Sequence, residues 1–139
     1  MDDPLRLDRA TWDALVAHAE SDFPFEVCGL LGIEDDGSIR HFVIDNDERS
    51  MTYYVMHAKQ MLKAMREIED DELHLVIYHS HTHTKAYPSA TDIRLAAYPD
   101  ATYAIVTLQN RDAPDIRAFH IRDGEVTERG VELVEGAPA

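Results

Sequence analysis

The sequence predicts a single-domain α/β fold in which helices flank a mixed β-sheet. The chain has 139 residues, which suits one domain better than two, and 45% of them are hydrophobic, enough for a packed core. Helical and strand patterns alternate along it, with hairpin turns between some strands and helices between others. Hairpins join antiparallel strands and helical crossovers join parallel ones, so we expect both kinds of pairing. We expect residues 1–139 to form this domain, with residues 135–139 as a frayed tail.

The first third of the chain predicts a helix followed by a β-hairpin. Residues 8–20 have a helical pattern, and Asp8 can cap the N-terminus. The apolar face of this helix carries Trp12, Leu15, Val16 and Ala19. Residues 27–33 form an apolar run typical of a buried strand. Turn residues at 35–38 separate this run from a second strand over 39–44, and the two strands form the hairpin.

The middle of the chain predicts two helices with a strand between them. Residues 57–69 have an apolar stripe at helical spacing. An apolar strand over 73–78 follows, and a loop over 79–87 leaves its end. The sequence Pro-Ser-Ala-Thr-Asp then opens a third helix, expected over residues 88–98.

The last third predicts only strands. Residues 102–108 are a strong strand. Residues 116–122 and 126–134 form a closing hairpin around Asp123-Gly124, a dipeptide typical of tight hairpin turns.

The charge of the chain excludes some classes of partner. Asp and Glu number 27 against 13 Lys and Arg, which gives a formal net charge of −14. A nucleic-acid-binding protein needs a cationic surface to displace phosphate counterions, and anionic membranes attract basic segments. We therefore expect no nucleic-acid partner and no membrane partner, but a small substrate or a partner with basic groups.

The cysteine content and the N-terminus predict a cytoplasmic protein. Cys28 is the only cysteine, so the chain forms no internal disulfide and no multi-cysteine zinc knuckle. The N-terminus is acidic and lacks the apolar run of a signal peptide. No apolar run approaches the ~20 residues of a membrane-spanning helix.

Histidines gather in one segment. Three of the eight lie within residues 79–83. His79 and His81 are two residues apart at the end of an extended segment, so their side chains point to the same side. Together they can bind one divalent metal ion, and Asp92, in the first turn of the next helix, can supply a third ligand. Three protein ligands leave a position for water, as in catalytic zinc sites; non-haem iron uses similar ligands but on other scaffolds.

Two further residues can complete a hydrolytic site. Glu26 enters an apolar strand, where a carboxylate is costly unless it has a partner or a function, so it is the candidate general base. Ser89 could donate its hydroxyl to an oxyanion that forms beside the metal. Gly29, close to Glu26, would let a neighbouring backbone approach closely.

Each of these residues also has a purely structural interpretation. Ser89 and Asp92 have the spacing of a helix N-cap and a first-turn acid, and Glu26 could be a paired structural carboxylate. Cys28 is expected to be a small buried residue, because the sequence around it offers no cationic group to activate a thiol. His83 is expected in a loop near the cleft, with substrate contact or competing metal ligation as alternatives.

The pattern of Glu26, His79-Ser80-His81, Ser89 and Asp92 resembles the motif of the JAMM (MPN-plus) metallopeptidase family. The spacing from the second histidine to the serine and the aspartate matches without a gap. The family fold is a cytidine-deaminase-like α/β sandwich with a mixed sheet, which agrees with the elements predicted above. Many members have proline at the position of Thr82. The bacterial branch that acts with sulfur-carrier proteins often lacks this proline, so the chain resembles that branch here.

The resemblance implies roles for individual residues. It implies one Zn²⁺ per chain held by His79, His81 and Asp92, with Glu26 as general base and acid and Ser89 stabilising the tetrahedral intermediate. Members that trim ubiquitin carry insertions, for which 139 residues leave little room. The resemblance therefore implies hydrolysis after the C-terminal Gly-Gly of a ubiquitin-like sulfur-carrier protein, with cysteine as the released group.

Three other functions are alternatives to this one. A non-catalytic MPN-type scaffold typically lacks part of the residue set that is complete here. A zinc deaminase shares the fold class but needs additional cysteine ligands, and one cysteine excludes the standard version. A cysteine–histidine hydrolase acting through Cys28 would keep its activity in the presence of a chelator.

Overall fold

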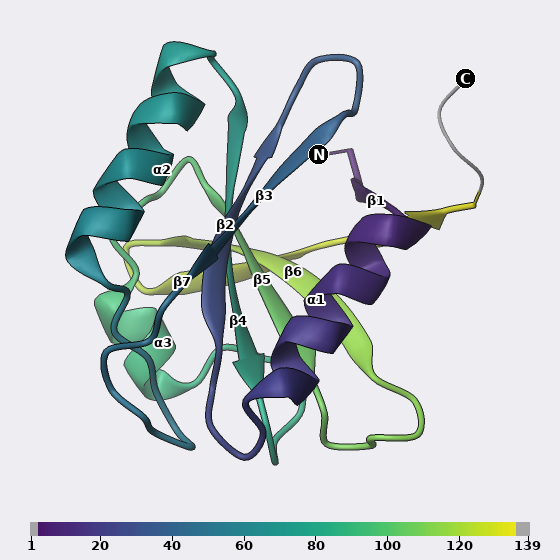
Figure 1. The fold of residues 1–139 in the computed structure, drawn as a ribbon, viewed down its shortest axis with the longest axis vertical. Helices are drawn as coiled ribbons and strands as arrows, with labels where there is room; N and C mark the ends of the chain where they lie inside the picture. Colours follow the sequence, from purple (N-terminus) through teal and green to yellow (C-terminus); the bar gives the residue numbers. More distant parts are fainter. Residues whose placement is uncertain (1–2, 136–139) are drawn as a thin grey trace.

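The computed structural model describes residues 3–135, which contain a six-stranded mixed sheet with helices on both faces (Figure 1). In chain order the elements are β1 (Leu5–Asp8), α1 (Arg9–Ser21), β2 (Cys28–Ile33), β3 (Ile39–Ile44), α2 (Ala58–Asp70), β4 (His74–His81), α3 (Ala90–Leu95), β5 (Thr102–Thr107), β6 (Asp115–Arg122), β7 (Glu125–Arg129) and β8 (Val131–Val134). The sheet has the order β3-β2-β4-β5-β6-β7. The β4–β5 pair is parallel and the other pairs of this sheet are antiparallel, so the predicted mixed α/β sheet is confirmed.

The sheet separates two hydrophobic layers. On one face, α1 packs against a cluster that includes Leu31 and Val76. On the other face, α2 packs against a cluster that includes Leu30 and Ile77, their neighbours in sequence. Successive residues of a strand point to opposite faces, so the continuous apolar runs of β2 and β4 supply both layers. Figure 1 shows α1 on one side of the sheet and α2 and α3 on the other.

The first helix and the first hairpin form as predicted. The Thr11 backbone N–H donates to the Asp8 carboxylate at 2.8 Å, which is the expected N-cap of α1. In the hairpin, β2 and β3 pair with Cys28 opposite Ile44. None of the described helices, all within residues 3–135, is long and apolar enough to span a membrane.

The strand that carries the two histidines is longer than predicted. We expected it to end before His79, but β4 continues through His81. Both neighbouring segments hold this end: the Ser80 N–H donates to the Val27 carbonyl at 3.0 Å, and the Leu108 N–H donates to the His81 carbonyl at 2.9 Å. The loop therefore starts only after the second histidine.

The third helix is shorter than predicted. We expected helix as far as residue 98, but α3 ends at Leu95 and Ala96 is extended, with φ −66° and ψ 119°. The next two backbone N–H groups, of Ala97 and Tyr98, donate to the Tyr103 hydroxyl at 3.1 and 3.0 Å. A side chain of β5 thus takes the hydrogen bonds that would continue the helix.

The C-terminal strand is divided in two. The predicted strand over 126–134 is β7 and β8, which part at Gly130, and β8 pairs in parallel with β1, a strand that the sequence did not predict. The Leu5 N–H donates to the Gly130 carbonyl at 2.8 Å. Within the expected tail, Glu135 forms an ion pair with Arg9 between side chains that are both at least half exposed. Residues 136–139 of that tail lie outside the described part of the chain.

Candidate metal centre and active site

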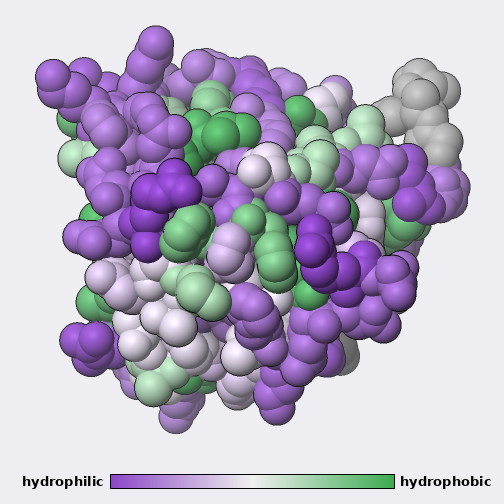
Figure 2. Space-filling model, turned by 60° about the horizontal axis from the view of Figure 1, so that its bottom comes forward, coloured by the Kyte–Doolittle hydropathy of each residue, from purple (hydrophilic) through white to green (hydrophobic). Residues whose placement is uncertain are grey.

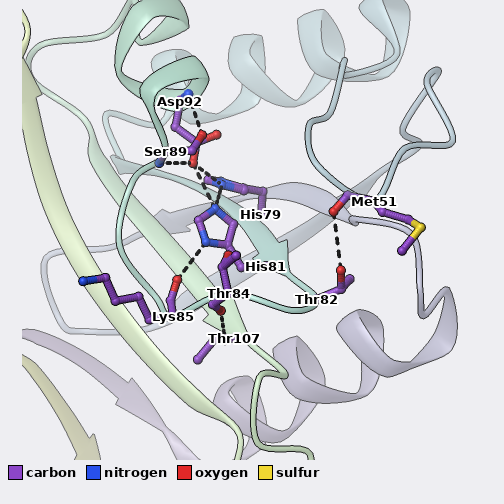
Figure 3. Close-up of polar contacts among 9 residues, drawn as sticks. All are labelled: Met51, His79, His81, Thr82, Thr84, Lys85, Ser89, Asp92 and Thr107. Carbon is purple, nitrogen blue, oxygen red and sulfur yellow. Dashed lines mark hydrogen bonds and ion pairs between the residues drawn. The ribbon is translucent and has the colours of Figure 1, made fainter.

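Two histidines of β4 and the first-turn aspartate of α3 point at one another (Figure 3). The Nε2 atoms of His79 and His81 lie 3.1 Å apart. The Asp92 Oδ2 atom lies 3.1 Å from the first of these nitrogens and 3.0 Å from the second. A tetrahedral ion with bonds of about 2.0–2.1 Å sets its donor atoms roughly 3.3 Å apart, close to this nearly equilateral triangle. The donor set therefore fits a small tetrahedral metal ion.

The other hydrogen bonds of these side chains favour ligation. The His81 Nδ1–H donates to the Lys85 carbonyl at 2.9 Å, which leaves Nε2 free to bind a metal. The Ser89 N–H donates to Asp92 Oδ2 at 2.9 Å, and the Asp92 N–H donates to the Ser89 hydroxyl oxygen at 3.1 Å. This reciprocal pair is a capping box at the start of α3, as the spacing suggested. The serine hydroxyl accepts in this pair and can still donate its own proton.

Glu26 lies just before β2, close to the metal-ligand candidates. Antiparallel pairing of β2 with β4 ends with Cys28 opposite His79. Beyond that pair, the Ser80 N–H donates to the Val27 carbonyl at 3.0 Å and the Val27 N–H donates to the Ser80 hydroxyl at 2.9 Å. The Glu26 carboxyl group interacts electrostatically with His81 and Asp92. The Glu26 side chain is only 2% exposed, and among the described residues its Oε1 atom has no hydrogen-bond partner. Burying a carboxylate oxygen without a hydrogen-bond partner is energetically costly. A chemical role for Glu26 would explain why the fold bears this cost.

Burial and neighbouring charges set the protonation of the site. Burial, with the nearby Asp92 carboxylate, raises the pKa of Glu26 to about 8, although His81 opposes this shift. Burial lowers the pKa of His79 and keeps it neutral, as a metal ligand must be. Burial alone would raise the pKa of Asp92, but hydrogen bonds from both histidines hold it far below its usual range. Glu26 is thus able to take up and release a proton near neutral pH.

Cys28 and His83 lie outside this cluster. The cysteine side chain is fully buried, and burial, with nearby Asp45 and Glu26, raises the pKa of its thiol to about 12. A thiolate is therefore scarce near neutral pH, which argues against a cysteine nucleophile. His83 is exposed in the loop after β4, where its ring lies 5.4 Å from that of Phe23.

An apolar cavity of about 290 Å³ adjoins the aspartate of the cluster. Its walls come from the segment before α2, from α2 and α3, and from β5. They include Tyr54, Met56, Met61, Met65, Leu95 and Tyr103. Figure 2 turns this end of the molecule toward the reader and shows hydrophobic side chains exposed among hydrophilic ones. The cavity can accept apolar side chains of a chain whose end reaches the cluster.

Residues 8–122 match the family described as prokaryotic homologs of the JAB domain (Prok-JAB). The chain belongs to this family. The match confirms the JAMM/JAB resemblance that the motif indicated, and it spans the elements from α1 to β6 that build the site.

Curated relatives agree with the Prok-JAB assignment. Proteins named CysO-cysteine peptidase from Mycobacterium tuberculosis and Mycobacterium bovis are 46% identical over 126 residues, covering 88% of this chain and 86% of theirs. A desampylase from Haloferax volcanii is 29% identical over 109 residues, covering 71% of this chain and 77% of its own. These names confirm the predicted hydrolase class of the family.

Solved structures agree with the Prok-JAB fold. A protein of Desulfitobacterium hafniense has a TM-score of 0.80 and 30% identity, covering 94% of this chain and 93% of its own. A protein of Salinibacter ruber has a TM-score of 0.59 and 24% identity, covering 96% and 92%, and shows likeness of fold alone.

One side chain of the site lies outside the sequence motif. The Tyr54 ring stacks on the His79 ring, with centroids 4.6 Å apart and an interplanar angle of 26°. It comes from the segment between β3 and α2 and shares no spacing with the motif. The only local signal is the short apolar run over 53–56, which equally suits a core contact.

Proposed function

We propose that this chain is a zinc-dependent peptidase that hydrolyses the bond after the C-terminal Gly-Gly of a ubiquitin-like sulfur-carrier protein and releases cysteine. The observation that carries the proposal is the triangle of His79, His81 and Asp92 donor atoms, 3.0–3.1 Å apart, with the buried Glu26 carboxyl group near enough to interact electrostatically with two of them. A non-catalytic scaffold would have no use for this combination.

The chain's own residues divide the work of hydrolysis. His79, His81 and Asp92 hold one zinc ion. The ion, when bound, supplies Lewis-acid chemistry that activates water and polarises a carbonyl. Glu26 takes the proton from the attacking water and delivers it to the amine that departs as the carbon–nitrogen bond breaks. Ser89 donates its hydroxyl proton to the carbonyl oxygen as negative charge develops there.

The relatives and the shape of the site support the proposed substrate. Relatives at 46% identity are named for a cysteine adduct of CysO, which supports cysteine as the leaving group. The apolar cavity beside Asp92 can hold the side chains of an extended carrier tail. The two glycines at the end of that tail have no side chains, so its backbone can come close to His79, His81 and Asp92. We place this activity in the cytoplasm, where a single free cysteine stays reduced.

Intact-mass spectrometry tests the proposal. A ubiquitin-like carrier that ends in Gly-Gly, extended by one cysteine, is incubated with the enzyme with and without a chelator. We expect loss of one cysteine residue mass, abolished by the chelator. Glu26→Gln should retain zinc but turn over at least ~10²-fold more slowly, because the amide cannot act as a base.

Two outcomes separate the parts of the proposal. If the adduct survives while linked ubiquitin or an unfolded peptide is cut, the carrier assignment fails and the metallopeptidase assignment stands. If hydrolysis continues at full rate in the chelator or in Glu26→Gln, the mechanism itself is wrong.

A further inference from the structure

The two histidines of the cluster are held in different ways. His81 is oriented by its Nδ1 hydrogen bond to the Lys85 carbonyl. The Nδ1 atom of His79 is buried and, among the described residues, has no hydrogen-bond partner. A metal-binding imidazole is usually oriented through its second nitrogen, so another contact must fix the ring of His79.

The stacked ring of Tyr54 is that contact. At 4.6 Å between centroids and 26° between planes, the pair lies within the range of about 4.5–7 Å over which aromatic rings stack favourably. The tyrosine side chain covers one face of the imidazole, which prevents the ring from turning about its long axis. A flat ring is required for this, whereas the hydroxyl group is not.

The segment that carries this tyrosine is anchored to the same site. The Asn46 side chain accepts from the Val55 N–H at 2.9 Å and donates to the Glu26 carbonyl at 3.0 Å. The Glu26 N–H in turn donates to the Ser50 carbonyl at 2.8 Å. Figure 3 shows a third link, in which the Thr82 hydroxyl donates to the Met51 carbonyl at 3.4 Å. The segment is therefore fixed both to the candidate base and to the end of β4.

We propose that Tyr54 is a positioning residue that holds His79 in its metal-binding orientation and links it to the substrate cavity. The same ring lines the apolar cavity, so a substrate tail in that cavity packs against the side chain that orients the ligand. This inference rests on the proposed function, because it takes His79 to be a zinc ligand.

Zinc release from the purified enzyme tests the role of the ring. Tyr54→Leu and Tyr54→Met remove the flat ring, and Tyr54→Phe keeps it. Transfer of zinc to a chromophoric chelator should show affinity about 10–100-fold weaker in Tyr54→Leu and Tyr54→Met, the usual effect of removing an outer contact of a ligand. Tyr54→Phe should behave as the wild type. The visible spectrum of the cobalt-substituted enzyme should change in Tyr54→Leu and Tyr54→Met and not in Tyr54→Phe.

Tyr53 offers a matched control. It is the neighbouring tyrosine, 38% exposed, and its hydroxyl lies 3.5 Å from a Glu48 carboxylate oxygen. Tyr53→Leu should bind zinc as the wild type does. Melting temperatures of all variants in chelator report the stability of the zinc-free fold. Where zinc-free Tyr54→Leu or Tyr54→Met melts close to the zinc-free wild type, its weaker zinc binding does not come from a damaged fold.

The outcomes are distinct from those of the hydrolysis test. Wild-type zinc affinity and an unchanged cobalt spectrum in Tyr54→Leu and Tyr54→Met would overturn the inference. Equal loss in Tyr54→Phe would also overturn it, because the hydroxyl and not the ring would then matter. Weaker zinc binding in Tyr54→Leu and Tyr54→Met supports it even if the wild type fails to cleave the carrier adduct, in which case only the proposed substrate is wrong.

Discussion

Position 29 must be glycine because the Tyr78 side chain fills the space beside it. A Cβ atom at Gly29 would lie 2.4 Å from the Tyr78 ring and its hydroxyl oxygen. That ring cannot move aside, because it is fully buried and its hydroxyl lies 2.7 Å from nitrogens of both His18 and His41. We expected a close approach of backbone at this position, and the approach is by an aromatic ring instead. Gly29 therefore serves packing and not chemistry.

Removal of single side chains tests the metal cluster at the scale of the residue. His79→Ala, His81→Ala and Asp92→Ala should each lose bound zinc, because two remaining donors hold the ion poorly. His83→Ala should keep about one zinc per chain, since its side chain is exposed and lies outside the cluster. Elemental analysis of the purified variants measures this. Zinc retained in His81→Ala but lost in His83→Ala would show that the ligands are assigned in the wrong register.

The candidate site was predictable where its signals are local. Alternation along a strand places His79 and His81 on one side, and helix-capping spacing relates Ser89 to Asp92. These patterns need no knowledge of the fold. The Lys85 carbonyl and the Tyr54 ring, by contrast, reach the histidines only through the folded chain.

At the scale of the element, α3 and the candidate metal site have a common origin. The helix has six residues, too few to be stable by itself. The reciprocal hydrogen bonds of Ser89 and Asp92 fix its start, and the same aspartate oxygen faces both histidines. The cap thus orients the carboxylate as well as the helix.

Ser89→Ala tests this double role. Loss of the cap should lower the free energy of unfolding by about 1 kcal/mol, measured in urea. Loss of the hydroxyl donor should lower kcat on the carrier adduct by roughly 10²–10³-fold. Ser89→Thr, which keeps a hydroxyl, is the control and should retain most of both. An unchanged kcat in Ser89→Ala would remove the serine from the proposed mechanism while leaving its capping role.

The elements that the sequence predicted well are those whose contacts are near in sequence. The N-cap of α1 and the β2–β3 hairpin depend on neighbouring residues, and both formed as expected. The pairing of β1 with β8 joins Leu5 to Val131, at opposite ends of the chain. The early end of α3 depends on the Tyr103 hydroxyl of another strand. Local pattern carries no information on such partners.

At the scale of the whole molecule, the sheet keeps two polar clusters apart. The candidate metal site lies on the face covered by α2 and α3. On the α1 face, the Tyr78 hydroxyl bridges His18 and His41, each 2.7 Å away. In this second cluster a buried tyrosine meets two partly buried histidines, and the cluster couples folding to pH. Burial lowers the pKa of His18, helped by the nearby His41, and burial also lowers the pKa of His41.

The sign of this coupling follows from proton binding. In the unfolded chain both histidines take up protons near their ordinary pKa of about 6.5, whereas the folded chain keeps them neutral to lower pH. Their contribution to stability is therefore complete above that pKa and is lost as pH falls from it toward the lowered values. Glu26, whose pKa is raised to about 8, affects stability in the opposite direction. Its contribution to the stability of the fold is lost as pH rises toward that value.

A comparison with His41→Gln isolates the histidine contribution. Glutamine can still form a hydrogen bond with the Tyr78 hydroxyl but takes up no proton. Urea unfolding in chelator, from about pH 8 to pH 5, should show stability falling more steeply in the wild type below about pH 6.5. The difference in slope is at most about 1.4 kcal/mol per pH unit for one histidine. Glu26 and the metal-site histidines are common to both proteins, so they cancel in the difference. Equal slopes would mean that His41 is not held neutral by the fold.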